Sequence, residues 1–572
     1  MTHRTDQPLP AGSRRTLALV VVLLAAFMDL LDSTIVNVAL PPVQWDLGAS
    51  FAQVQWVVAA YLLGFAVLLI TGGRLGDIAG RKRMFLIGVA GFTAASALCG
   101  VAGTAGQLIA FRALQGAGAA LMVPQVLAIV TTMFPPAQRG AALGAFGALA
   151  GLATVGGPVL GAVLTDADLF GWGWRSIFVI NVPVGVLAFA AALVVVRESR
   201  SPRALRLDPS GVALLTAALL LLLVPLVQGR ELGWPGWTFA SMALAAAVFA
   251  VLIRGQLRRT AAGRSPLIVM TLFRSRSFGA GLAANLVFFV LVTGYFLIFT
   301  LYLQAGLGYS VLKAGLTGIP WSFGTSFAAA VSATVLVPRL GRRVLVLGAV
   351  LLGAGLVGII VTTQVAGAAV TPWQLLPATL AGGLGMGMIV APILDFILSD
   401  VPAGDAGSGS GLVNAMQQVG GAIGVAVLGV VFFGQLSAQA GPQADAVAPA
   451  LRAELREQGV TAGAAEQIVA GMRRCFTERV DDYGGPEPAG CRQATAGDAR
   501  TTRAVVAAAD QARRQTFAAA LRSTLWVEAG LAVLTLLLIL RLPRQARHHD
   551  EAGPEPRPVP AGSGATTPAP LR

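Results

Sequence analysis

The feature that most constrains this chain is a series of long apolar segments. Each holds roughly 20 residues, the length that an α-helix needs to cross the hydrocarbon core of a bilayer. Only 12% of the 572 residues are charged and the mean hydropathy is +0.74, whereas about 25% of residues are charged in a soluble domain. The pattern predicts an all-α polytopic membrane protein.

The chain contains about fourteen such segments, each long enough to span a membrane. The polar N-terminal stretch leads into the first segment without a small-residue cleavage site, so no signal peptide is expected. The predicted spans are residues 17–40, 54–72, 85–103, 107–132, 141–163, 176–196, 210–228, 237–253, 278–303, 314–337, 344–363, 373–397, 411–434 and 523–541.

The distribution of basic residues predicts the orientation. Cytoplasmic loops of membrane proteins carry an excess of Lys and Arg. If the N-terminus is cytoplasmic, the short outer loops hold only Arg175, Arg230 and Lys313, while the inner loops hold many basic residues. We therefore predict that both termini are cytoplasmic. The formal net charge of +14 then reflects topology, and no nucleic-acid partner is expected.

One polar insert and one polar tail depart from the pattern of apolar spans joined by short loops. Residues 435–516 are polar and Ala-rich, and we expect an extracytoplasmic helical hairpin there. This insert contains Cys475 and Cys491. Outside the cytoplasm, where the environment is oxidising, these two cysteines either form a disulfide or remain as free thiols. The Pro- and Gly-rich residues after about Asp550 are typical of disorder.

A polar segment with the sequence GGRLGDIAGRKRMF follows the second span. Positive-inside topology explains its cations, but not its acid or its glycines, which indicate a tight turn around Asp77. The segment resembles the signature loop of the major facilitator superfamily, with Ile78 where that family usually has a base. The resemblance implies a cytoplasmic gate in which Asp77 pairs with neighbouring Arg side chains and with a helix N-terminus. The predicted gating residues are Gly73, Gly76, Asp77, Gly80, Arg81, Lys82 and Arg83.

Two further segments resemble motifs of the same superfamily. In the fourth span, LIAFRALQGAGAALMVP places Arg112 and Gln115 on one helix face and resembles the motif R-x-x-Q-G-x-G. In the fifth span, GLATVGGPVLGA resembles the antiporter motif G-x-x-x-G-P-x-x-G-G. Ala153 and Ala162 replace two glycines of that motif. The motif residues that remain are Gly157, Pro158 and Gly161.

The segments WRSIFVINVPVG and LDSTIVNVALP look like parts of the fourteen-span drug/proton antiporter family. VPRLGRRVLVLG is a degenerate echo of the signature loop, as expected from two diverged six-helix halves. The resemblance therefore implies a major facilitator fold with two extra central helices. The expected parts are a cytoplasmic tail at 1–16, an N-terminal half at 17–200, two extra helices at 201–260, a C-terminal half at 261–541 and a cytoplasmic tail at 542–572.

The first span carries two acids, Asp29 and Asp32. A charge inside a span is costly and usually faces a cavity or a partner. Asp32 lies in the segment that resembles the family, and Arg112 is its expected counter-charge. We predict that Asp32, Asp29 and Arg112 couple proton movement to transport, with a purely structural pairing as the alternative.

Two other acids have simpler interpretations. Asp395 lies near the cytoplasmic end of its span, where it can reach water. Glu528 follows Trp526 and is expected in the outer aromatic belt of the membrane interface. Further polar residues line a substrate cavity or, alternatively, form hydrogen bonds between helices. The cavity candidates are Asn37, Gln115, Asn181, Asn285, Tyr295, Asn414 and Gln418.

These features predict a monomeric, proton-coupled exporter of drugs, antibiotics or other amphiphilic, cationic compounds. A lipid or amphiphile translocase and a proton-coupled importer are the alternatives. No nucleophile with a base, no metal cluster and no ATP-binding G-x-x-x-x-G-K-(S/T) loop occurs in the sequence, and the three histidines all lie in the tails. An enzyme or an ATP-driven pump is therefore not expected. The proton gradient would supply the energy without any cofactor.

Overall fold

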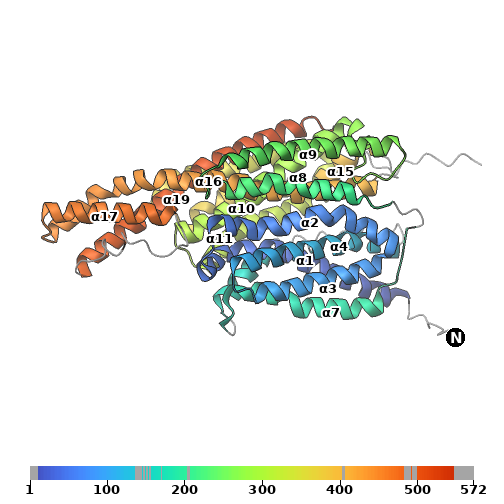
Figure 1. The fold of residues 1–572 in the computed structure, drawn as a ribbon, viewed down its shortest axis with the longest axis horizontal. Helices are drawn as coiled ribbons and strands as arrows, with labels where there is room; N and C mark the ends of the chain where they lie inside the picture. The colour runs from blue at the N-terminus through green and yellow to red at the C-terminus, as the bar shows by residue number, and fades with distance from the viewer. Residues whose placement is uncertain are drawn as a thin grey trace, which may run out of the picture.

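The computed structural model describes residues 11–134, 145, 149, 152–153, 156–168, 171–201, 206–401, 406–481, 491 and 499–545. Within these residues the chain is helical and contains no β-strand. Thirteen helices in the described part of the chain are long and apolar enough to cross a membrane. Figure 1 shows them as an elongated bundle that narrows into an extension at one end. We call this the extension end, and the opposite end, where α1 begins, the N-terminal end.

The N-terminal half confirms the first four predicted spans and the sixth. Most of the predicted fifth span, 141–163, lies outside the described residues, although residues 156–166 are helical. The elements of this half are α1 (Ala11–Leu47), α2 (Phe51–Ala79), α3 (Arg81–Gly100), α4 (Ala105–Met133), the 3₁₀ turn η2 (Gly173–Arg175), α6 (Ser176–Val179) and α7 (Asn181–Val195).

The C-terminal half contains the remaining membrane helices and four short irregular segments. Of these, η3 and η6 are 3₁₀ turns, and η4 and η5 are π-helical. The elements are η3 (Met270–Arg274), α10 (Arg276–Leu301), η4 (Tyr302–Gly306), α11 (Val311–Val331), η5 (Ser332–Leu336), α12 (Val337–Leu340), α13 (Arg343–Ala366), η6 (Gly367–Ala369), α14 (Pro372–Val390), α15 (Ile393–Leu398), α16 (Ala406–Glu457), α17 (Ala462–Asp481) and α19 (Ala499–Ile539).

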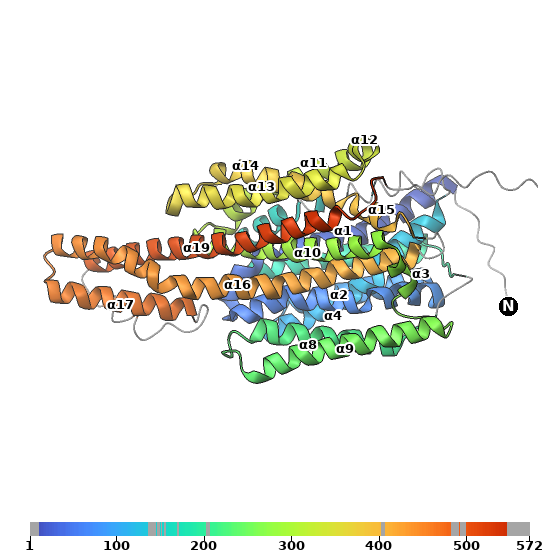
Figure 2. The ribbon, with the colours of Figure 1, turned by 90° about the horizontal axis from the view of Figure 1, so that it is seen from above.

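The two extra helices, α8 (Pro209–Gln228) and α9 (Gly236–Ala261), form a hairpin on one side of the bundle (Figure 2). α8 packs against α2 of the N-terminal half and α16 of the C-terminal half. Leu219 and Leu223 of α8 share one apolar cluster with Ala66 of α2 and Ala426 of α16. The hairpin therefore covers a seam where the two halves meet.

Asp208 fixes the start of this hairpin. Its carboxylate accepts hydrogen bonds from Gly211 N at 2.9 Å, Gln256 Nε2 at 2.9 Å and Leu267 N at 3.3 Å, and Arg259 Nη2 lies 3.0 Å away. Burial by itself would raise the pKa of Asp208. The hydrogen bonds and the nearby guanidinium outweigh burial and hold this pKa below its usual value.

We expect Asp208→Ala to lower the free energy of unfolding by about 1 to 2 kcal/mol at neutral pH, because a helix cap is lost. A carboxyl with a lowered pKa stabilises the fold fully above its ordinary pKa of about 3.9. This stabilisation is lost as the pH falls through the folded-state value. Thermal unfolding of both proteins between neutral and acidic pH should show the difference shrinking below about pH 4. A difference that stays constant across this range would contradict the prediction.

The described residues of the insert, 435–481, 491 and 499–516, are mostly helical, and two of their helices continue from the membrane bundle instead of forming a separate hairpin. α16 runs unbroken for 52 residues, which at 1.5 Å per residue is about 78 Å, far longer than a bilayer is thick. α19 likewise continues from the extension into the membrane bundle, and α17 packs between them (Figure 1). The extension is therefore rigidly continuous with two membrane helices. The apolar faces of α16 and α17 make this possible, since Leu451, Leu455 and Met472 are buried in one cluster.

The structure joins Cys475 and Cys491 in a disulfide, with their Cα atoms 4.6 Å apart. Closing a loop of this size typically contributes about 3 kcal/mol. We expect a reducing agent to lower the melting temperature of the native extension and to leave a Cys475→Ser/Cys491→Ser variant unaffected. Differential scanning calorimetry of the full-length protein would test this. If the reductant also lowers the melting temperature of the variant, the loss of stability does not come from this disulfide.

The signature segment differs from the predicted loop. α2 continues to Ala79 and α3 begins at Arg81, so the turn consists of Gly80 alone. Gly80 has a φ of +117°, a conformation that side chains other than glycine rarely adopt. The echo in the second half is also a short turn that begins with a glycine of positive φ: Gly341, at +54°, and Arg342 separate α12 from α13. The internal repeat seen in the sequence is therefore also a structural repeat.

Candidate functional site

A buried polar network lies inside the N-terminal half, with Asp32 of α1 at its centre. Asp32 is 0% exposed. Arg112 Nη1 lies 2.5 Å from Asp32 Oδ2, while Gln115 Nε2 and Asn181 Nδ2 donate to Asp32 Oδ1 at 2.8 and 2.9 Å. Helices α1, α4 and α7 thus meet at one carboxylate. The expected counter-charge is in place, and two predicted cavity residues, Gln115 and Asn181, bind Asp32 directly.

Arg112 is held by several groups at once. Its Nη1 also donates to Gln115 Oε1 at 2.6 Å, and its Nε donates to the carbonyl oxygen of Val57 at 3.2 Å. The guanidinium carbon lies 4.2 Å from the centre of the Tyr61 ring, within the range of a cation–π interaction. A charge removed from water is tolerable only with such partners. Arg112 therefore depends on both Asp32 and the α2 backbone.

Asp29, one turn before Asp32, occupies a different environment. It is buried, and the hydroxyl of Tyr61 donates a hydrogen bond to its Oδ1. Because Tyr61 also stacks against Arg112, it links the two acids of α1 through one ring. Asp29 and Asp32 therefore belong to one connected group of buried polar side chains.

Tyr61 and Ser96 belong to the network although sequence reasoning did not single them out. Ser96 Oγ accepts from Gln115 Nε2 at 2.6 Å and from Asn181 Nδ2 at 3.2 Å. Tyr61 is one of only five tyrosines, and its polar hydroxyl in an otherwise apolar span was an available signal. A single serine in a Gly- and Ala-rich span carries no such signal.

The glycines of the antiporter motif lie directly against α1. A Cβ atom placed on Gly157 would be 2.0 Å from Thr34 Oγ1, and one on Gly161 would be 2.6 Å from Ile35 Cγ1. Both contacts are shorter than real side chains allow, so glycine is required for this approach. The glycines therefore set the position of the α1 turn that follows Asp32.

The predicted gating residues lie at the N-terminal end of the bundle. Arg81 Nη2 pairs with Asp77 Oδ1 at 2.9 Å, as expected. The N-terminus of α3 is occupied by Glu198, which accepts from Lys82 N at 3.1 Å and Arg83 N at 3.2 Å. That Asp77 pairs with the N-terminus of another helix stays a prediction. Glu198 can reach the N-terminus of α3 because the segment after α7 returns to this turn. Asp77, in contrast, lies within α2.

The glycines at this end serve close packing. A Cβ on Gly76 would be 1.9 Å from Gln125 Oε1, whereas the nearest atom to one on Gly73 is a Pro124 side-chain carbon at 3.7 Å. Gln125 Nε2 in turn donates to the carbonyl oxygen of Gly72 at 2.8 Å. Of the two motif glycines inside α2, only Gly76 is therefore fixed by a tight contact with α4.

The remaining cavity candidates do not gather at Asp32. Asn37 donates to Ser33 O at 3.3 Å, and Asn414 donates to Ser410 O at 3.0 Å, each within its own helix. Asn285 of α10 donates to Val413 O of α16 at 3.2 Å, which is an interhelical hydrogen bond. Gln418 is half-buried on α16.

Tyr295 of α10 lies in an aromatic cluster in the C-terminal half. Its ring stacks on Trp321 of α11 at 4.2 Å between centroids and on Phe299 at 5.2 Å. Asp395 is exposed, in agreement with its predicted access to water. The placement of Glu528 in an interfacial belt is wrong, because Glu528 is 0% exposed whereas Trp526 is 57% exposed. The two residues are two apart and so face different sides of α19.

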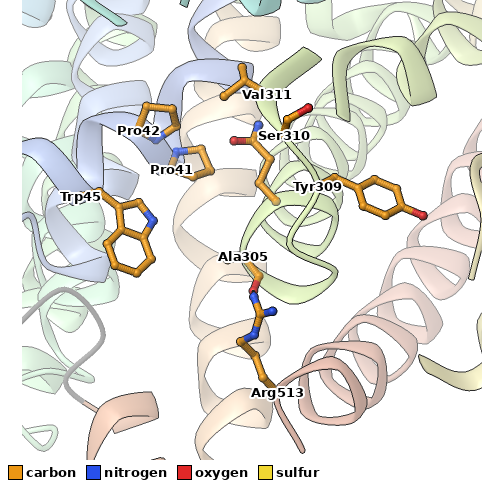
Figure 3. Close-up of a pocket in the computed structure, with 9 residues that line it drawn as sticks. Pro41, Pro42, Trp45, Ala305, Tyr309, Ser310, Val311 and Arg513 are labelled. Atoms are coloured by element: carbon orange, nitrogen blue, oxygen red, sulfur yellow. The ribbon is translucent and has the colours of Figure 1, made fainter. Parts of the chain in front are cut away.

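A cavity of about 230 Å³ lies at the extension end, where α1 of one half meets η4 and α11 of the other (Figure 3). Gln304 Nε2 donates to Val38 O at 2.8 Å beside it, and Arg513 Nη1 donates to Ala305 O at 2.6 Å. Ligand sites usually exceed about 300 Å³, so this cavity marks a junction between the halves. Among the described residues, no group of three or more His, Cys, Asp or Glu could hold a metal ion.

A helical membrane bundle that holds a buried ion pair inside its N-terminal half defines a polytopic membrane protein. The chain belongs to the Major Facilitator Superfamily, whose profile matches residues 22–425. It is a multi-pass protein of the cell membrane, and its family points to transport rather than catalysis.

Individual proteins resemble the chain over most of its length. It is 42% identical to the probable actinorhodin transporter of Streptomyces coelicolor, over 95% of this chain and 94% of that protein. It is 37% identical to the tetracenomycin C resistance and export protein of Streptomyces glaucescens, over 72% and 75%. A bacterial homologue of the human lysosomal transporter Spinster, solved in an inward-facing and occupied conformation, has the same fold, with a TM-score of 0.55, 18% identity and coverage of 94% and 99%.

Proposed function

We propose that this protein exports amphiphilic, drug-like compounds across the cell membrane in exchange for protons. Two relatives that align over most of their length are named for the transport or export of the antibiotics actinorhodin and tetracenomycin C. The multidrug resistance protein Stp of Mycobacterium tuberculosis is also 38% identical over 76% of this chain. The proton gradient is the energy source, and the transporter acts as a monomer without ATP or a cofactor.

The observation that carries the proposal is the fully buried pair of Asp32 and Arg112. Protonation of Asp32 removes its charge and with it the main attraction that holds Arg112 in place. Arg112 then keeps its contacts with the Tyr61 ring and the Val57 carbonyl of α2, while its attachment to α1 weakens. Proton binding therefore changes how α1 is attached to α4.

A change in the attachment of α1 to α4 can alter the contacts between the two halves, because α1 touches both of them. Thr34 and Ile35 lie against Gly157 and Gly161, and Gln304 of the other half binds Val38 O. A proton that enters from the predicted outer side releases substrate there, the halves rock, and the proton leaves inside as new substrate binds. At the opposite end, Asp77, Arg81 and Glu198 act as the gate that closes the cytoplasmic side.

The test is transport by the purified native chain in proteoliposomes with an imposed pH gradient. Gradient-driven movement of a cationic dye, absent when the gradient is collapsed, is the expected result. Movement of a fluorescent lipid without any dye transport would favour a lipid translocase. Dye uptake in the same direction as the proton would identify an importer and overturn the proposal.

A further inference from the structure

Glu528 of α19 is a buried acid that the proposed cycle does not use. It is 0% exposed, and neither of its carboxyl oxygens has a hydrogen-bond partner among the described residues. Its neighbours Trp526 and Val527 are 57% and 42% exposed, so α19 turns Glu528 specifically toward the interior. A buried polar group without a partner costs free energy, so packing alone does not account for a glutamate at this position.

The helices around Glu528 offer it no counter-charge. α19 packs against α10, α13, α16, η4 and η6, and in the extension against α17. The three residues of η6, Gly367–Ala369, carry no charge. At membrane depth, α13 and α16 carry no charged side chain, and the only charged residue of α10 is Arg276 at the far end. The titratable groups that α10 and η4 contribute are Tyr295 and Tyr302. On α19 itself, the nearest cation is Arg522, which donates to Thr363 O at 3.3 Å.

Tyr295 lies on α10, which packs against α19, and it is near enough to Glu528 to be affected by a charge there. Its hydroxyl is also buried without a hydrogen-bond partner among the described residues. The ring is held firmly, because it stacks on Trp321 and Phe299. An unpaired donor and an unpaired carboxyl thus face the same interior region of the C-terminal half.

The contrast with Asp32 determines the charge of Glu528. Asp32 accepts hydrogen bonds from Arg112, Gln115 and Asn181, which is an environment for an ionised carboxylate. Glu528 has no such donor, and an isolated buried carboxylate costs far more than a neutral carboxyl. In this conformation Glu528 therefore holds a proton.

Glu528 lies close to the extension end in depth. Arg522 binds Thr363 near the end of α13, whereas Ala532 Cβ lies 3.9 Å from where a Cβ would stand on Gly353. Glu528 is between these two levels, six residues or about 9 Å from Arg522. Glu528 is therefore nearer in depth to the predicted outer side than to the cytoplasmic side.

We propose that Glu528 is a second proton-binding site, located inside the C-terminal half, that takes up one proton in each transport cycle. The proton is bound in the conformation described here. It is released when rearrangement of the half lets the Tyr295 hydroxyl or water donate to the ionised carboxylate. This inference rests on the proposed proton-coupled function, and with Asp32 it gives each half its own proton site.

Infrared difference spectroscopy of the full-length protein tests the proton site without relying on transport. We expect a protonated-carboxyl band at neutral pH that disappears reversibly as the pH is raised, and that is missing in Glu528→Gln. Labelling the native protein with ¹³C-glutamate should shift this band, whereas a band from Asp29 would stay in place. The labelling keeps the test valid even if the variant does not fold.

Transport measurements give the second readout. The number of protons exchanged per substrate, taken from the pH gradient that just stops net dye movement, should fall by one in Glu528→Gln. Thr524→Val is the matched control, because Thr524 is buried one turn earlier and donates only to Ala520 O at 2.9 Å. This variant should keep the native ratio.

Two results would overturn the inference. One is the absence of a pH-sensitive glutamate band in the native protein, and the other is an unchanged proton ratio in Glu528→Gln. A native chain that moves no dye under any gradient would instead refute the proposed function. The infrared result would still decide whether Glu528 binds a proton.

Discussion

Replacing Asp32 by Asn is expected to abolish proton-driven transport in proteoliposomes. Asn has nearly the same shape and can still accept a hydrogen bond from Arg112, but it cannot bind or release a proton. The pH gradient then has no group through which to act on the Arg112 contact. Gradient-driven dye movement that survives Asp32→Asn would remove Asp32 from the coupling role.

The same substitution should destabilise the protein by about 3 to 5 kcal/mol, because it leaves a buried cation without its counter-charge. Arg112 cannot relieve this by losing its proton, since a guanidinium keeps its charge in proteins. Removing both charges in Asp32→Asn/Arg112→Met should restore most of the free energy of unfolding without restoring transport. Denaturant unfolding in detergent measures this cycle. A double variant less stable than Asp32→Asn would contradict the ion-pair argument.

Asp46→Asn is the matched control for this experiment. Asp46 is on the same helix and also pairs with an arginine, Arg175, at 2.7 Å, but both side chains are partly exposed to solvent. Exposed pairs contribute only about 0 to 1 kcal/mol. This variant should therefore keep both native transport and nearly native stability.

Replacing Gly116 by Ala is expected to lower the transport rate by on the order of tenfold or more. A Cβ on Gly116 would lie 2.1 Å from the carbonyl oxygen of Tyr61, so α2 and α4 must separate by about 1 Å. Gly116 is one turn from Arg112, and the separation would pull Arg112 from Val57 O and from the Tyr61 ring. Overpacking of this kind typically costs 1 to 3 kcal/mol, which exceeds the gain in helix propensity of about 1 kcal/mol.

Gly106→Ala tests whether the effect is local. Gly106 is on the same helix, but no atom lies within 4 Å of where its Cβ would stand. Its replacement should leave transport unchanged and stability within about 0.5 kcal/mol of the native value. Equal losses of transport rate in Gly116→Ala and Gly106→Ala would show that any added methyl group on α4 is harmful. That result would contradict the explanation by close packing of α2 and α4 at Gly116.

The sequence by itself determined the class and most of the architecture. Length and hydropathy are properties of each segment alone, so the spans could be predicted without knowing how the helices pack. The motif around Arg112 and the echo near Gly341 placed the chain in its family and revealed the repeat. Asp32 could be paired with Arg112 because each is too costly to bury alone.

Only the tertiary structure decided which polar groups meet. Tyr61 and Ser96 joined the network, Glu198 rather than Asp77 capped α3, and Glu528 turned inward, because rotation and packing of the helices fix where side chains point. These choices depend on contacts between segments distant in sequence, which periodicity within one span does not contain. The long continuation of α16 into the extension was hidden for the same reason, since its polar part is stabilised by packing against α17.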